Sequence, residues 1–261
     1  MYHSITFGDK NTWDDWCLIP TLDPIISPPT VKTNFIDVPG SNGSLDMSEI
    51  LTGYPVYNNR EGSLSFIAMN RSASLQPECN PLKFRDLIAD IMDYLHGHKM
   101  NMVLEDDPDY YYSGRFELEN ANANINFNEI VIKYILEPYK WSIRSSIDNW
   151  VWDTFNFRTG FISRSLFYNL NVTTAQKVIN FTKNLIGSAP VMPTFVVNAT
   201  SDSGITIRLV NESLGIDRTL KFQNGTRHNP DFFLYGDDVK LYYWVEYGTG
   251  TLTIDYKRGR L

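Results

Sequence analysis

One segment of the chain has the hydrophobic spacing of an amphipathic helix. Between residues 81 and 96 (PLKFRDLIADIMDYLH), apolar residues recur every three or four positions, which places them on one helix face. Pro81 suits the first turn, Asn80 suits the N-cap and Gly97 suits the end. The pattern predicts a helix packed on a sheet through a stripe made of Phe84, Leu87, Ile88, Ile91, Met92 and Leu95.

In the rest of the first half, apolar and polar positions alternate with the period of a strand. The predicted strands are residues 60–70, 100–105, 110–119 and 128–137. Residues 120–124 (NANAN) are expected to form the tip of a long hairpin. Phe127, Val131 and Ile135 make the second face of its last strand partly apolar, so this hairpin is expected to have a partner on each side. These three residues are the candidate inter-subunit interface.

The second half shows alternation but no convincing helix. The predicted strands are residues 191–198, 204–210, 218–222, 232–235, 239–247 and 251–256. Short strands separated by turns such as Asn224-Gly225 indicate a β-sandwich. The sequence therefore predicts a mainly β protein with an N-terminal β-sandwich domain, residues 1–141, that carries one α-helix and the long hairpin, and a C-terminal β-sandwich domain, residues 142–261.

The glycines of VPGSNGSLDMSEIL, residues 38–51, raise the question of a phosphate-binding loop. Such a loop needs a Lys and a hydroxyl directly after its last glycine, and a helix behind them. Gly43 is followed by Ser44-Leu45-Asp46 instead. Since Pro39 fixes φ and both glycines tolerate positive φ, the segment is predicted to be a turn between two elements.

The net charge of −7 is unevenly distributed. Residues 1–141 carry 10 Lys and Arg against 20 Asp and Glu, a net of −10, and residues 142–261 carry 13 against 10, a net of +3. An acidic first half is unsuited to binding nucleic acid, because phosphate binding depends on Lys and Arg. The chain has no apolar run of membrane-spanning length and no signal-peptide pattern, so it is expected to stay in the cytosol or to leave within an assembly or by lysis.

No group of residues makes a convincing catalytic, cofactor or metal site. His96-Gly97-His98 suits the end of a helix better than half of a metal site. Glu105-Asp106-Asp107-Pro108-Asp109 is expected to be a solvated turn, although an acid/base pair of a tail-associated hydrolase stays open as an alternative. No Ser stands in a G-x-S-x-G motif. Cys17 and Cys79 are expected to be packing residues. The protein is predicted not to be an enzyme and to need no cofactor.

A cluster of aromatic residues in the second half suggests a different kind of site. Tyr242-Tyr243-Trp244, with Trp150 and Trp152, could stack on sugars if the rings lie on the surface of the sandwich. Packing in a core or an interface explains the same residues, because aromatic side chains dominate both. Trp150, Trp152 and Trp244 are the sugar-stacking candidates.

Taken in order, several segments resemble the distal tail protein (Dit) family of long non-contractile-tailed bacteriophages, the siphoviruses, in its Gram-positive phage and prophage form. The segments are Ile5-Thr6-Phe7-Gly8 with Trp13 and Trp16, Val38 to Asp46, Tyr57 to Glu61, the helix at 81–96, Tyr112-Ser113-Gly114-Arg115, Pro138-Tyr139-Lys140 and Thr251 to Arg258. They span nearly the whole chain.

The resemblance implies a structural virion protein of the tail tip, assembled in the cytoplasm of the bacterial host. Its N-terminal domain would form a homohexameric ring, the baseplate hub, and its C-terminal domain would be a galectin-like or carbohydrate-module-like sandwich outside the ring. The ring would join the tail tube protein to tail-tip and receptor-binding proteins, and DNA would pass the lumen without specific binding. A carbohydrate-binding host-adsorption protein acting through the C-terminal sandwich is the alternative.

Overall fold

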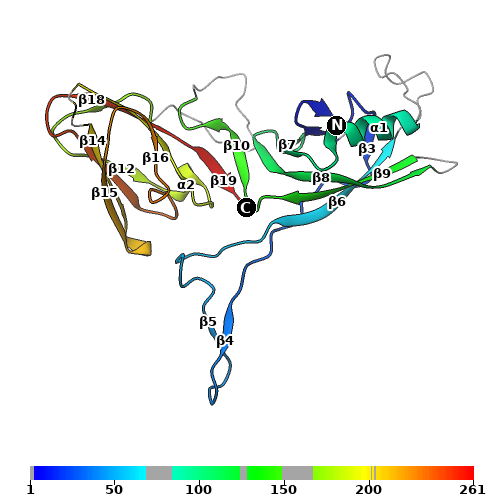
Figure 1. The fold of residues 1–261 in the computed structure, drawn as a ribbon, viewed down its shortest axis with the longest axis horizontal. Helices are drawn as coiled ribbons and strands as arrows, with labels where there is room; N and C mark the ends of the chain where they lie inside the picture. The colour runs from blue at the N-terminus through cyan, green and yellow to red at the C-terminus, as the bar shows by residue number, and fades with distance from the viewer. Residues whose placement is uncertain (1–2, 69–83, 124–127, 149–166, 201, 203) are drawn as a thin grey trace. The chain divides into compact units, whose positions relative to one another are not determined.

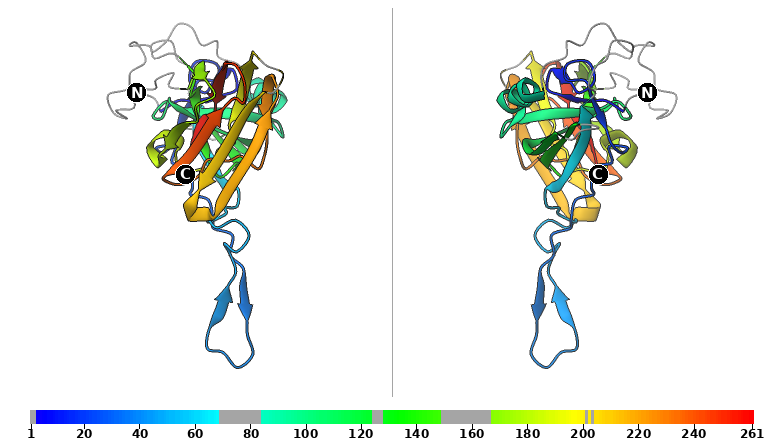
Figure 2. Two further views of the ribbon diagram at one scale, coloured as in Figure 1. Left: turned by 90° about the vertical axis from the view of Figure 1, so that its left-hand side faces the viewer. Right: turned by 90° about the vertical axis from the view of Figure 1, so that its right-hand side faces the viewer.

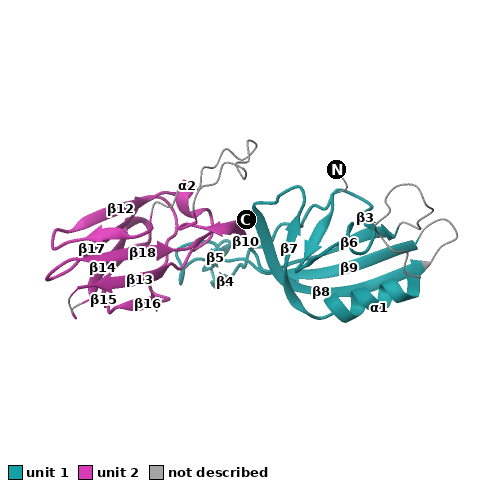
Figure 3. Ribbon diagram, turned by 90° about the horizontal axis from the view of Figure 1, so that it is seen from above, with its two compact units in different colours: residues 1–140, 261 teal, residues 141–260 magenta. Residues whose placement is uncertain are grey.

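The protein consists of two compact units, each built mainly from β-strands. The computed structural model describes residues 3–68, 84–123, 128–148, 167–200, 202 and 204–261. Contacts divide the chain into residues 1–140 with Leu261 (unit 1) and residues 141–260 (unit 2), whereas the sequence placed the division after residue 141 (Figure 3). The predicted mainly β fold is confirmed. Among the described residues, no helix is long and apolar enough to span a membrane.

The main antiparallel sheet of unit 1 has the strand order β2-β1-β7-β8-β9-β6-β3. Its strands are β1 (Ile5–Phe7), β2 (Lys10–Asn11), β3 (Leu18–Pro20), β6 (Arg60–Ala68), β7 (Lys99–Leu104), β8 (Tyr110–Ala123) and β9 (Asn128–Leu136). Figure 1 labels five of these strands, β3, β6, β7, β8 and β9. The predicted long hairpin is confirmed: β8 and β9 pair from Gly114–Leu136 to Ala123–Asn128, with a register shift between Leu118 and Asn120. Its tip was expected at residues 120–124, but residues 120–123 continue β8, because Asn120 and Asn122, which favour turns locally, pair with β9 instead. Strand β6 pairs with the other edge of β9 along its whole length, so β9 lies in the middle of the sheet.

Helix α1 (Phe84–Leu95) packs on this sheet through Leu87, Ile91 and Leu95, as predicted. Met92 was expected in the same stripe but is exposed, because it lies about 100° around the helix from Ile91. Tyr94 packs against the core instead, and its hydroxyl donates to the carbonyl of Phe7 at 2.9 Å. The predicted helix start at Asn80 and Pro81 lies outside the described residues.

Residues 30–58 form a separate ribbon, called here the arm, which stands clear of the sheet of unit 1 in the views of Figures 1 and 2. Its tip is the hairpin of β4 (Phe35–Asp37) and β5 (Ser44–Asp46), and its base is held by bonds such as Asn58 N–H to Thr30 O at 2.8 Å. Gly40 and Gly43 take φ of +84° and +78° in the connecting turn, a conformation that glycine adopts without strain. The predicted turn is therefore confirmed.

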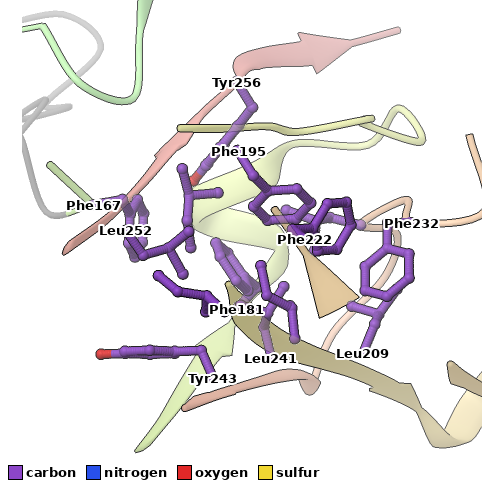
Figure 4. Close-up of a cluster of buried hydrophobic side chains, with 14 of the residues drawn as sticks. Phe167, Phe181, Phe195, Leu209, Phe222, Phe232, Leu241, Tyr243, Leu252 and Tyr256 are labelled. Carbon is purple, nitrogen blue, oxygen red and sulfur yellow. The ribbon is translucent and has the colours of Figure 1, made fainter. Parts of the chain in front are cut away.

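Unit 2 is a sandwich of two four-stranded antiparallel sheets, as the alternation predicted. One sheet has the order β11-β18-β13-β16 and the other β12-β17-β14-β15. The strands are β11 (Leu170–Val172), β12 (Lys177–Phe181), β13 (Thr194–Ala199), β14 (Ile205–Asn211), β15 (Ile216–Phe222), β16 (Gly225–His228), β17 (Val239–Trp244) and β18 (Gly250–Asp255). Their inward side chains enclose a core rich in aromatic rings, with Phe181, Phe195 and Phe232 fully buried (Figure 4).

Some elements of unit 2 differ from the prediction. Residues 232–235 were expected to be a strand but form only an isolated bridge, Val191 with Leu234. Phe232 and Leu234 are fully buried, so the alternation reflects burial of a loop and not a ladder of hydrogen bonds. The sequence also missed a one-turn helix, α2 (Lys183–Ile186), and the strand pair β10 (Lys140–Ser145) and β19 (Lys257–Arg260). The turn of α2 depends on tertiary contacts, since the Lys183 N–H donates to Asp237 at 2.7 Å.

Candidate functional site

The sheet of unit 1 has a second face, opposite the core, that combines aliphatic and charged side chains. Strand β9 sends Ile130, Ile132, Tyr134 and Leu136 into the core, where none is more than 2% exposed. Val131, Lys133 and Ile135 therefore point to the opposite side, where Val131 and Ile135 are only half-buried. This surface, formed by the outward residues of β6, β9 and β8, is called here the open face. Phe127, the third candidate interface residue, lies outside the described residues.

The register places polar residues on both sides of the two aliphatic ones. Ile135 lies between Glu61 and Arg115, and Val131 lies between Ser65 and Asn120. Lys133 separates the two rows and lies between Ser63 and Glu117 on the neighbouring strands. The two half-buried aliphatic side chains make the open face a candidate surface for contact with another protein.

The arm is the second candidate surface. Seven of the seventeen exposed large apolar residues in the described part of the chain lie in the arm. Phe35 occupies one face of the hairpin, and the cross-strand pair Ile36 and Leu45 occupies the other. Exposed apolar patches mark interaction sites on soluble proteins, so the arm is a candidate surface for a protein partner. The glycines and Pro39 predict only a turn here, although the apolar residues on both sides of the turn are a usable signal for an exposed hairpin.

Arg60 fixes the chain at the base of the arm. Its side chain is buried, 4% exposed, and donates from Nε to Pro138 O at 2.9 Å and from Nη1 to Ser27 O at 3.0 Å. The guanidinium also lies 5.6 Å from the centre of the Tyr112 ring. Burial lowers the pKa of Arg60 from its ordinary value. The residue thus ties the segment that leads into the arm to the end of β9.

The acidic run at residues 105–109 forms the predicted turn and holds neighbouring segments together. Glu105 accepts from the Ser4 N–H at 2.8 Å, Asp106 contacts His3 at 2.7 Å, and Asp107 pairs with Lys140 at 2.6 Å. Charge-assisted contacts of this kind stabilise a loop. Three of its carboxylates are therefore engaged in fixing the N-terminal segment and the end of unit 1.

The contact between His3 and Asp106 predicts a pH-dependent attachment of the N-terminal segment. The hydrogen bond to Asp106, with Asp23 at 3.5 Å, raises the pKa of His3 above 6.5. This stabilisation is complete below the unfolded-state pKa and is lost as the pH rises through the folded-state pKa. In an NMR titration of the His3 ring, Asp106→Asn is expected to move its pKa down toward 6.5. An unchanged midpoint would contradict the assignment of the shift to this contact.

The remaining histidine and cysteine candidates make contacts within the fold. The ring of His96 accepts the Leu118 N–H at 3.1 Å, and the ring of His98 lies 2.9 Å from Tyr94 O, both at the end of α1. Within the described residues, no three His, Cys, Asp or Glu side chains gather to hold a metal ion. Cys17 is disulfide-bonded, which corrects the expectation of two packing cysteines, since pairing depends on distances in the fold that spacing does not show. Cys79 lies outside the described residues.

Unit 2 presents two neighbouring aromatic side chains on the outer face of the β12-β17-β14-β15 sheet. Tyr242 and Trp244 alternate with the buried residues of β17 and are half-buried. Tyr243 was grouped with them, but it is 5% exposed and belongs to the core, because neighbouring residues of a strand point to opposite faces. Of the sugar-stacking candidates, Trp244 therefore lies on the surface, and Trp150 and Trp152 lie outside the described residues. Tyr242 and Trp244 are called here the platform.

Ion pairs surround the platform. Arg208 donates from Nε to Asp217 at 2.8 Å and lies 5.9 Å from the centre of the Tyr242 ring. Lys240 pairs with Glu212 at 3.1 Å, and Lys221 pairs with Glu246 at 2.9 Å. The pairing with Arg208 lowers the pKa of Asp217, and the pairing with Glu212 raises the pKa of Lys240. These three cations are thus each matched by a carboxylate.

Comparison with known proteins identifies a structural neighbour for the whole chain. No family model and no curated protein sequence matches it. The fold is similar to that of the Dit protein of phage SPP1, described as a paradigm of the hub adsorption apparatus in phages that infect Gram-positive bacteria. The TM-score is 0.61 over 100% of both chains, and 14% of the residues are identical. The fold of the chain is therefore Dit-like, as the resemblance of the sequence segments predicted.

Proposed function

We propose that the protein is a structural hub of a phage tail tip. The observation that carries this proposal is the similarity to the SPP1 Dit protein, because it extends over 100% of both chains. Shared fold alone does not determine function. The proposal therefore also depends on two features of this chain itself, the open face and the arm, which suit a protein that works within an assembly.

In the proposed hub, six copies form a ring through unit 1. Val131 and Ile135 on the open face would meet a different surface of the neighbouring copy, which is a head-to-tail contact that closes on itself. The arm would reach beyond its own unit and cover its apolar side chains on the next copy. The ring would join the tail tube protein to tail-tip and receptor-binding proteins at the virion tail tip. The net charge of −10 on residues 1–141 would keep passing DNA from adhering to the channel wall.

The proposed role is mechanical and does not involve catalysis. Glu105, Asp106 and Asp107, the candidates for a hydrolase, are committed to contacts with other segments of unit 1. The alternative role, adsorption to a host glycan through unit 2, is compatible with the hub, because the platform and the assembly surfaces belong to different units.

Light scattering coupled to size-exclusion chromatography tests the hub. The chain has a mass of 30.0 kDa, so a ring of six copies would have a mass of 180 kDa. A species of that mass is expected at micromolar concentration. A protein that stays at 30.0 kDa at all concentrations, including in a mixture with the tail tube protein, would contradict the proposal.

A further inference from the structure

We propose that the platform of Tyr242 and Trp244 binds a neutral oligosaccharide. The two rings project from the same side of β17, two residues apart, so they lie about 7 Å from each other along the strand. Strand β17 is in the interior of its sheet, between β12 and β14. The two aromatic rings therefore form a strip in the middle of the outer surface of this sheet. The strip is long enough to contact one or two pyranose rings.

The polar groups beside the rings are available to a ligand. Within the described part of the chain, the Trp244 indole N–H, the Tyr242 hydroxyl and the Asn180 amide make no hydrogen bond. Val178, 49% exposed and paired with Tyr242 across the strands, extends the apolar strip. A pyranose has C–H faces that stack on aromatic rings and hydroxyl groups at its edge that need donors and acceptors. The platform offers both kinds of contact at the same place.

The charges around the platform favour a neutral ligand. Arg208, Lys240 and Lys221 each have a carboxylate partner, Asp217, Glu212 and Glu246. The surface therefore has no excess positive charge with which to hold a polyanion such as a polyol phosphate or a nucleic acid. A protein partner would bury roughly 800 Å² with few charges in the centre of the interface. Here ion pairs limit the uncharged area to the strip itself, which suits a narrow ligand such as a sugar chain better than a protein surface.

Binding of the full-length protein to defined carbohydrates tests this proposal. The probes are neutral tetrasaccharides of glucose, galactose and N-acetylglucosamine, with poly(glycerol phosphate) as the anionic comparison, measured by calorimetry. At least one tetrasaccharide is expected to bind, and Trp244→Ala and Tyr242→Ala are each expected to weaken its binding about tenfold, the loss of one aromatic contact. Trp244→Phe keeps a ring without the N–H and is expected to retain part of the affinity.

The matched control is Tyr168→Ala, which removes an exposed tyrosine of unit 2 away from the platform. It should bind the tetrasaccharide as the unaltered protein does. Near-ultraviolet circular dichroism verifies the fold of each variant. The proposal is overturned if no tetrasaccharide binds, if only poly(glycerol phosphate) binds, or if folded Trp244→Ala and Tyr242→Ala variants both bind like the unaltered protein.

Discussion

Replacement of Phe116 by alanine is expected to destabilise unit 1 by about 3–5 kcal/mol, the cost of emptying the space of a fully buried phenylalanine. The Phe116 side chain is 0% exposed and lies between the sheet and α1. Its ring packs edge-on against that of Phe7, with 4.9 Å between the ring centroids. Loss of the ring removes contacts of both layers at once. For a unit of this size, the melting temperature of unit 1 should fall by about 10 °C or more.

The matched variant is Phe195→Ala in unit 2, which removes a fully buried ring packed against Phe222 and Phe232. Hydrogen exchange of peptides from each unit during heating distinguishes the two effects. Phe116→Ala should advance exchange in residues 84–136, and Phe195→Ala should advance exchange in residues 194–256. If either variant accelerated exchange equally in both units, the two cores would unfold in one cooperative transition. The boundary after residue 140 would then not separate two independently unfolding units.

The sequence predicted the elements whose pattern is local and repeated. The hairpin of β8 and β9, the helix α1 and most strands of the sandwich follow from periodicity, because burial of one face requires the same spacing over many residues. Short elements were missed. The one-turn helix α2 and the edge strand β16 contain too few residues to show a period, and their conformation depends on contacts with distant segments.

The candidate surfaces were predictable in part for the same reason. Val131 and Ile135 could be placed on one face because β9 alternates without interruption. The separation of Tyr243 from Tyr242 and Trp244 was also predictable from the alternation. Val239, Leu241 and Val245 lie on the strand face of Tyr243, whereas Lys240 and Glu246 lie on the face of Tyr242 and Trp244. The role of Arg60 could not be predicted, because its acceptors Ser27 and Pro138 are distant in sequence.

Ile135→Asp is expected to convert the proposed ring into monomers. Ile135 is half-buried on the open face of the isolated chain, so the fold loses little when it is changed, and the new carboxylate has Arg115 beside it across the strands. In the ring, the same carboxylate would be buried against a neighbouring copy without water, at a cost of at least about 2 kcal/mol for each contact. That cost corresponds to about thirtyfold weaker association per contact.

Because every copy contributes one such contact, the free-energy cost is repeated around the ring. The species of six times 30.0 kDa, or 180 kDa, should therefore be absent at micromolar concentration. Met92→Glu is the control: it replaces an apolar residue of unit 1 that is 43% exposed on α1, away from the open face, and should leave the mass unchanged.

The double variant Phe35→Ser with Leu45→Ser distinguishes the contribution of the arm from that of the open face. If the arm only strengthens a ring built by the open face, this variant should shift assembly to higher concentration and still reach the full mass. An Ile135→Asp protein that retains the mass of the unaltered ring would exclude the open face as the contact and leave the arm as the surface that joins the copies.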